Sequence, residues 1–109
     1  MPLASRTLTA RLHDPGGQAI AGARLIAQLA DSDGRPRSHY LPGGAVLSRP
    51  SESTSGDDGV VALELVPNAG MVPAGAHYQI RVIAPDGSEF TRLTLEMPDE
   101  DAFLGDIGG

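Results

Sequence analysis

The chain has 109 residues, the usual size of one domain, and this length leaves room for a single modest hydrophobic core. Its net charge is −6, with eight arginines, no lysine and fourteen acidic residues, which argues against a nucleic acid or an anionic membrane as partner. The chain contains no cysteine, so disulfides, thiolate metal sites and a cysteine nucleophile are excluded.

The composition favours a β structure. The chain has 14 glycines and 9 prolines but only two tyrosines, two phenylalanines and no tryptophan. Frequent turn residues indicate many short strands, and the scarcity of aromatics indicates a thin core built from Leu, Val, Ile and Ala.

The first third of the chain predicts two strands. Residues 7–13 alternate between apolar and polar side chains, as a half-buried strand requires, and the turn motif Asp14-Pro15-Gly16-Gly17 follows. Residues 23–30 alternate again and end at Asp31-Ser32-Asp33-Gly34. A helix is the alternative for this second segment because Ala, Leu and Gln are good helix formers, but the period is two and no N-cap precedes it.

The middle of the chain gives a weaker signal. Prolines and glycines interrupt residues 35–56, so we expect a long loop with one short edge strand around Ala45-Val46-Leu47. Residues 51–55 are polar and have the composition of a flexible loop tip that tolerates variation or touches a partner. Asp57-Asp58-Gly59 then predicts a tight turn.

Three further strands are predicted after this turn. Residues 60–66 are almost entirely apolar and indicate a central strand covered on both faces. Residues 78–84 alternate, and Pro85-Asp86-Gly87 joins them as a hairpin to residues 88–97. We therefore expect an all-β fold: a small antiparallel β-sandwich of about seven short strands, forming one domain over residues 1–109 with its core at about residues 6–97.

The C-terminal tail, residues 98–109, differs from the rest in charge. Residues 96–109 include five acidic residues and no basic one. The tail predicts one helical turn, with carboxylates near its N-terminal end and Phe103, Leu104 and Ile107 sharing one side. Two interpretations remain open: the tail folds back over a sheet edge, or it docks on a neighbouring subunit.

The sequence contains no recognisable catalytic motif. His13, His39 and His77 fall in separate predicted elements, without the spacing of a nucleophile triad or a zinc site. The Asp-rich turns lack the later ligands of a calcium loop, and the Gly-Gly pairs do not lie between a strand and a helix as in phosphate loops. We therefore expect no enzyme activity, no metal and no cofactor.

Several motifs along the chain resemble a known module. In order they are Leu8-x-Ala10-x-Leu12-x-Asp14-x-Gly16-x-Gln18-x-Ile20-x-Gly22-Ala23, then Asp57-Asp58-Gly59-x-x-x-Leu63-x-Leu65, then Tyr78-x-Ile80-x-Val82. Together they resemble the transthyretin-like (prealbumin-like), carboxypeptidase-regulatory-like β-sandwich, an Ig-like fold. Within that group, Leu93-x-Leu95-x-Met97-Pro98-Asp99-Glu100-Asp101 followed by Phe103-Leu104 resembles the N-terminal domain of prophage tail fibres and related spike-base proteins.

The resemblance implies a structural role in a particle. It suggests a non-catalytic adaptor at the base of a tail fibre, or of a head or tail spike, in a bacteriophage or a gene transfer agent. Its partners would be capsid, tail or fibre subunits in a symmetric oligomer of the virion, and the chain would be made in the bacterial cytoplasm without a signal peptide. The chain departs from tail fibres by ending at Gly109, where a fibre would continue into a trimeric shaft.

The candidate contact residues come from the tail and from the apolar island of the middle loop. They are Phe103, Leu104, Ile107, Asp99, Glu100, Asp101, Val46 and Leu47. The first alternative is a monomeric carbohydrate-binding or adhesion module, although a chain without Trp offers little aromatic surface on which to stack a sugar. The second alternative, a hydrolase or metal enzyme, requires the three histidines to converge.

Overall fold

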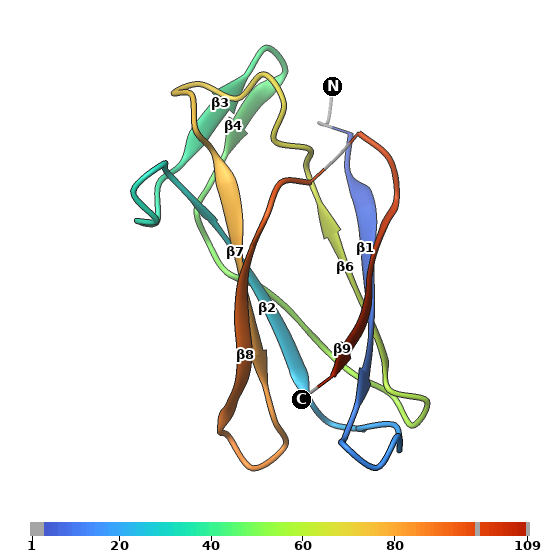
Figure 1. Ribbon diagram of the computed structural model, residues 1–109. Coiled ribbons are helices and arrows are strands. Elements are labelled where there is room, and N and C mark those ends of the chain that lie inside the picture. The colour runs from blue at the N-terminus through green and yellow to red at the C-terminus, as the bar shows by residue number, and fades with distance from the viewer. Residues whose placement is uncertain (1–3, 98, 109) are drawn as a thin grey trace.

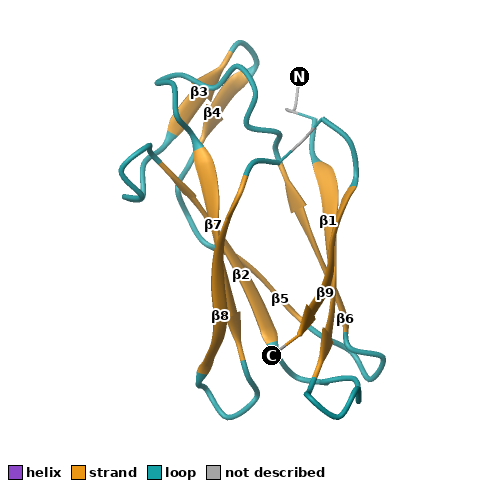
Figure 2. Ribbon diagram, in the orientation of Figure 1, coloured by secondary structure: helices purple, strands orange, loops and turns teal. Residues whose placement is uncertain are grey.

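The computed structural model describes residues 4–97 and 99–108, with the backbone alone described for Phe90 and residues 105–108. The described chain consists of strands and loops, with no helix (Figure 2). The strands are β1 (Arg6–His13), β2 (Arg24–Ala30), β3 (His39–Leu41), β4 (Gly44–Val46), β5 (Ser51–Thr54), β6 (Val60–Leu65), β7 (His77–Ile83), β8 (Glu89–Leu95) and β9 (Ala102–Gly108).

Two sheets form the layers of a β-sandwich, which confirms the expected fold class (Figure 1). The first sheet has the order β6-β1-β9, in which β1 is antiparallel to β6 and parallel to β9. The second has the order β5-β2-β7-β8, and all its pairs are antiparallel. A small ribbon, β3-β4, lies at one end of the sandwich.

The core lies between the two sheets and consists mainly of small aliphatic side chains. Alternate residues of β1, β2, β6 and β7 point into it, as the period of two predicts. Its fully buried large side chains, apart from His39, are Leu8, Leu12, Leu25, Leu29, Ile80, Val82 and Met97. The predicted strands at residues 7–13, 23–30, 78–84 and 88–97 are thus confirmed, with boundaries shifted by one or two residues.

Four turns share one hydrogen-bonding pattern. In residues 14–18, 31–35, 56–60 and 84–88, the N–H of the first residue donates to the carbonyl oxygen of the fifth. The fourth residue is always a glycine, at φ between 76° and 91°, and its N–H donates to the carbonyl oxygen of the first. A left-handed residue at this position is typical of three-residue hairpin turns, so the turn predictions at these four motifs are confirmed.

Residues 35–56 contain more strand than we expected. The expected short strand around Ala45-Val46-Leu47 is present as β4, and β3 and β5 form in addition. The predicted flexible tip at residues 51–55 is wrong because β5 pairs with β2. Ser55 is buried beyond β5, where its Oγ accepts a hydrogen bond from the N–H of Ala23 and donates one to the carbonyl oxygen of Ile20. An exposed edge strand has little apolar alternation, so its sequence resembles a loop.

Two other expectations are corrected. β6 lies at the edge of its sheet rather than in the centre, and Ala62 and Glu64 are exposed on its outer face. The tail forms a strand rather than a helical turn, since residues 102–108 make up β9. The free edge of β1 supplies backbone partners for this segment, and that long-range pairing overrides its local helical signal.

Gly59 gives a direct test of how closely the first sheet packs against the β1–β2 connection. It lies at φ +76°, and a Cβ there would stand 2.5 Å from the carbonyl oxygen of Leu12 and 3.1 Å from the Cβ of Ala19. Gly59→Ala should therefore lower the free energy of unfolding by about 2 to 4 kcal/mol, through backbone strain and overpacking combined. The midpoint of chemical denaturation measures the loss.

Gly87→Ala is the matched control, because Gly87 has φ +91° but nothing within 4 Å of the added Cβ. This variant should lose only the conformational part, about 1 kcal/mol. Equal losses in the two variants would show that the approach of Gly59 to Leu12 adds no packing constraint.

Tyr78 is an aromatic residue of the core, and its hydroxyl forms one hydrogen bond. Its hydroxyl donates to the carbonyl oxygen of Val66 at 2.7 Å, and its side chain is buried. Burial raises the pKa of Tyr78 from its ordinary value of 10.0 to about 12.

The raised pKa makes stability depend on alkaline pH. Below pH 10 the phenol is protonated in both states, whereas between pH 10 and about 12 the unfolded chain loses the proton more readily than the folded one. Stability should therefore fall as the pH rises through this interval. Denaturation midpoints from pH 8 to 12 should fall more steeply for the wild type than for Tyr78→Phe, and parallel curves would contradict the assignment.

Candidate assembly surfaces

The histidines and carboxylates do not converge on one site. His39 is fully buried with Nδ1 2.8 Å from the carbonyl oxygen of Arg37, while Nδ1 of His77 is 3.3 Å from the carbonyl oxygen of Gly75. In the described part of the chain, no three His, Asp or Glu side chains are grouped to hold a metal ion. The same residues include no helix that could cross a membrane.

The Asp-rich turns use their carboxylates locally. Asp31 Oδ1 accepts the backbone N–H groups of Asp33 and Arg35, and the bond from Arg35 is the main reason why the pKa of Asp31 is lowered. Asp86 Oδ1 accepts both the hydroxyl and the backbone N–H of Ser88, which lowers the pKa of Asp86. These carboxylates therefore cap turns, as their Asx geometry predicts.

A hollow of about 560 Å³ lies between the 68–76 loop and the end of β8. Asn68 holds its base: the side-chain Oδ1 accepts the N–H of Met97, and the backbone N–H donates to the Met97 carbonyl oxygen. The wall is formed by small and apolar residues, with Glu96 as its one ionisable side chain. This hollow lacks the converging polar groups of a catalytic site.

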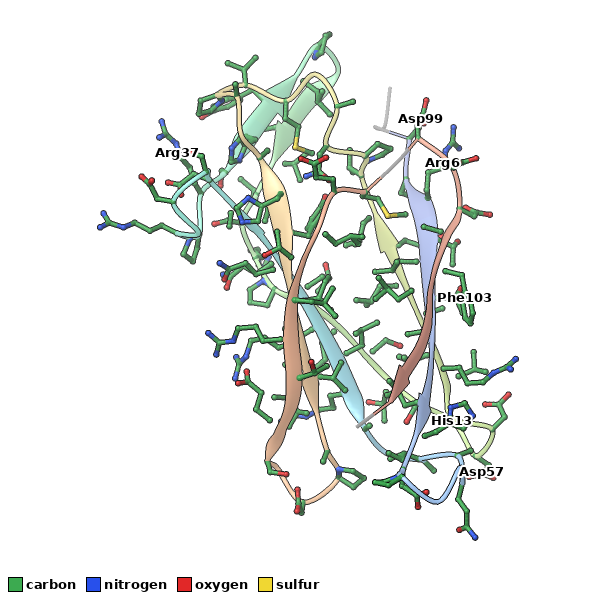
Figure 3. All side chains as sticks on the ribbon, viewed as in Figure 1. Arg6, His13, Arg37, Asp57, Asp99 and Phe103 are labelled. Atoms are coloured by element: carbon green, nitrogen blue, oxygen red, sulfur yellow. The ribbon has the colours of Figure 1, made fainter. Side chains whose placement is uncertain are left out.

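The acidic start of the tail is fixed to the beginning of β1. Asp99 Oδ1 lies 3.1 Å from Nη2 of Arg6 and 3.2 Å from its Nε, and Asp101 Oδ1 accepts the backbone N–H of Thr7 at 2.9 Å (Figure 3). Glu100, between them, is exposed. The structure thus gives Asp99 and Asp101 a role within the chain, besides any contact with a partner.

The tail presents Phe103 on the outer face of the first sheet. Phe103 pairs with Thr9 of β1, which pairs in turn with Ala62 of β6, so these side chains form a row across the sheet. The ring is 57% exposed and points away from the sandwich interior (Figure 3). Large apolar side chains exposed on a flat face are typical of contact surfaces.

Leu104 lies on the opposite face from Phe103. It is half-buried and packs against the core, because successive residues of a strand alternate between faces. The expectation that Phe103 and Leu104 share one side is therefore wrong. The backbone of Ile107 pairs with Leu12, but the Ile107 side chain lies outside the described part of the structure.

The outer edge of β9 pairs with no other described strand. β9 lies at the end of its sheet, with only β1 as neighbour. Its free N–H and C=O groups are therefore available for pairing with another chain.

A second exposed apolar surface lies on the β3-β4 ribbon. Tyr40 and Val72 exchange both backbone hydrogen bonds, at 2.8 and 2.9 Å, so their side chains lie next to each other, and they are 59% and 62% exposed. Leu47, just beyond β4, is 61% exposed, whereas Val46 is half-buried and packs against the core. The sequence identified Leu47 but not Tyr40 or Val72, because the pairing of residues 40 and 72 leaves no local signal.

Comparisons with known proteins identify the fold. No family model matches the chain, and no curated protein matches it by sequence. The major pilin subunit BcpA of Bacillus cereus matches in structure with a TM-score of 0.51 at 15% identity, covering 96% of this chain and 29% of the pilin. A variant of BcpA gives a TM-score of 0.50, also at 15% identity, over 96% of this chain and 30% of that one.

The pilus-presented adhesin Spy0125 (Cpa) matches at a TM-score of 0.45 and 10% identity, over 99% of this chain and 27% of the adhesin. The chain thus spans less than a third of each of these structures. At such identities the likeness to BcpA shows a shared β-sandwich fold and nothing further. These are pilus proteins, and none is a phage tail fibre.

The hydrogen bond from Thr7 to Asp101 predicts how firmly β9 is held. Asp101→Ala removes the acceptor and should speed amide hydrogen exchange in β9 without changing exchange in β2 and β7. Glu100→Ala, at an exposed neighbour, is the control and should leave β9 unchanged. Equal exchange in both variants would contradict a role for Asp101 in fixing the tail.

Proposed function

We propose that this chain is a non-catalytic assembly domain that joins neighbouring protein subunits of a polymeric structure. The observation that carries the proposal is the position of Phe103, more than half exposed on an edge strand whose outer backbone is unpaired. The structural likeness to a domain-sized part of a major pilin subunit is consistent with such a role. A surface of this kind gains affinity from strand pairing and from burial of the ring.

The finer form of the proposal is an adaptor at the base of a phage tail fibre or spike, or in a gene transfer agent. It is supported by the sequence resemblance of residues 93–104 to prophage tail-fibre domains. Capsid, tail or fibre subunits would be its partners in the virion. In a symmetric particle, many copies of a weak contact add up to stable attachment.

The alternative is a carbohydrate-binding or adhesion module. One observation favours it: the ring of Tyr40 is exposed beside Val72 and offers a single stacking surface for a sugar. A single ring gives less binding surface than the paired aromatics that sugar sites commonly use.

Phe103→Ser tests the assembly function. Loss of the ring should weaken association with other subunits by about tenfold or more, since burial of half a large aromatic side chain is worth on the order of 1.5 kcal/mol. Thr94→Ala, an exposed change on β8, is the control. Sedimentation velocity of the full chain, alone and with recombinant tail, capsid or pilus-type subunits, measures the association.

A different set of results would support the adhesion alternative. A chain that stays monomeric with every subunit offered, and that binds glycans in a manner lost in Tyr40→Ser, would replace the assembly function with the adhesion alternative.

A further inference from the structure

Two segments of this acidic chain carry opposite charge. Residues 35–50 contain Arg35, Arg37 and Arg49 and no acidic residue, whereas residues 96–109 contain five acidic residues and no basic one. Each segment also exposes large apolar side chains: Tyr40 and Leu47 in the first, Phe103 in the second. The two segments are therefore complementary both in charge and in apolar character.

Exposed residues of the basic segment, together with Val72, make up what we call the ribbon face: Arg37, Tyr40, Leu47, Arg49 and Val72. The backbone N–H of Ser48 donates to Ser38 Oγ at 3.1 Å. This bond brings Arg37, one residue before Ser38, and Arg49, one residue after Ser48, to the same open end of the β3-β4 ribbon. Both guanidinium groups belong to exposed residues.

Two nearby carboxylates offset part of this positive charge. The charges of Arg35 and Arg37 act on Asp31, whose carboxylate already accepts two backbone N–H groups within the 31–35 turn. Glu64 borders the small hollow that Arg49 and Leu47 line. Within the described residues, neither Arg37 nor Arg49 forms an ion pair. Their charge therefore remains available to a partner.

The acidic segment forms the second surface, which we call the tail face: Asp99, Glu100, Asp101 and Phe103. Arg6 neutralises Asp99, and Asp101 is fixed by the N–H of Thr7. Glu100 is exposed, and the donor to Asp101 is an uncharged backbone N–H group. Phe103 follows two residues after Asp101, within β9.

The outer side chains of the two faces lie apart within one molecule, although Asp99 and Leu41 of β3 border the same small hollow. β3 and β4 lie at one end, beside the second sheet, whereas β9 is the outer strand of the first sheet, and Arg37 and Phe103 point away from each other (Figures 1 and 3). β9 makes no contact with β3 or β4. Because Arg37 and Phe103 point away from each other, a contact between these parts of the two faces joins different copies.

We propose that the tail face of one copy binds the ribbon face of a second copy, so that copies assemble head to tail. This inference rests on the proposed assembly function and names the partner of the tail as another molecule of this chain. Because the two faces differ, the contact is heterologous, and each added copy leaves one free face of each kind. Association should therefore continue beyond a dimer as the concentration rises.

Salt separates the two components of the contact. The screening length is about 8 Å at physiological ionic strength and becomes shorter as salt is added, so the attraction between exposed charges weakens. Added salt does not weaken the stabilisation that comes from burying Phe103 and Leu47. Self-association measured by sedimentation velocity should decrease from 50 mM to 500 mM NaCl without disappearing.

A mixing experiment with the full chain tests the pairing of faces. Phe103→Ser damages only the tail face, and Leu47→Ser damages only the ribbon face. Each variant alone should associate about tenfold more weakly than the wild type. An equimolar mixture should recover association but stop at a one-to-one complex, because only one intact face of each kind can meet.

Arg49→Glu provides a second variant of the ribbon face that changes charge rather than apolar area, and Thr94→Ala is the control outside both faces. Arg49→Glu should also be rescued by mixing with Phe103→Ser. Circular dichroism and thermal melting of each variant identify any that is unfolded before its association is interpreted.

The outcomes separate this inference from the proposed function. If Phe103→Ser weakens association and the ribbon variants do not, or if mixing fails to restore a complex, the head-to-tail pairing is overturned while the assembly function stands. If the wild type is monomeric alone but binds other subunits, the head-to-tail pairing is likewise overturned and the assembly function stands. A wild type that associates with nothing overturns both.

Discussion

β1 forms backbone hydrogen bonds along both of its edges, to β6 on one side and to β9 on the other. Its inward side chains, Leu8, Ala10 and Leu12, are fully or almost fully buried, so the strand also supplies the centre of one core layer. The position of the tail follows from this pairing, since β1 is the one neighbour of β9 among the strands that the structure describes. Without β1, the first sheet, half of the core and the exposed position of Phe103 would all be lost together.

Much of the fold could be predicted from local patterns. Where one face of a strand is buried, as in β1, β2 and β7, the alternation of side chains is visible in the sequence, and the Asp and Gly residues of the turns mark where these strands end. β3, β4 and β5 bury few side chains, so their sequence differs little from that of a loop, and only Ala45-Val46-Leu47, which overlaps β4, indicated a strand. β9 was beyond local reasoning because its partner is almost a whole chain length away.

The candidate surfaces also divide into residues that have a local sequence signal and residues whose position depends on long-range pairing. Composition alone pointed to Phe103 and Leu47, because isolated large apolar residues stand out in polar segments, and both are exposed. The separation of Phe103 from Leu104 depends on the strand, and the apolar pair of Tyr40 and Val72 depends on a bridge between a ribbon and a distant loop. Contacts set by tertiary pairing cannot be read from composition.

The parallel arrangement of β1 and β9 has a mechanical consequence. Since the two strands run in the same direction, the chain enters the domain at one end of the sandwich and leaves at the other (Figure 1). Tension applied between Arg6 and Gly108 would pull these neighbouring strands past each other along their length. Their hydrogen bonds would then be loaded in shear and share the force, instead of breaking one after another as in a hairpin peeled from its end.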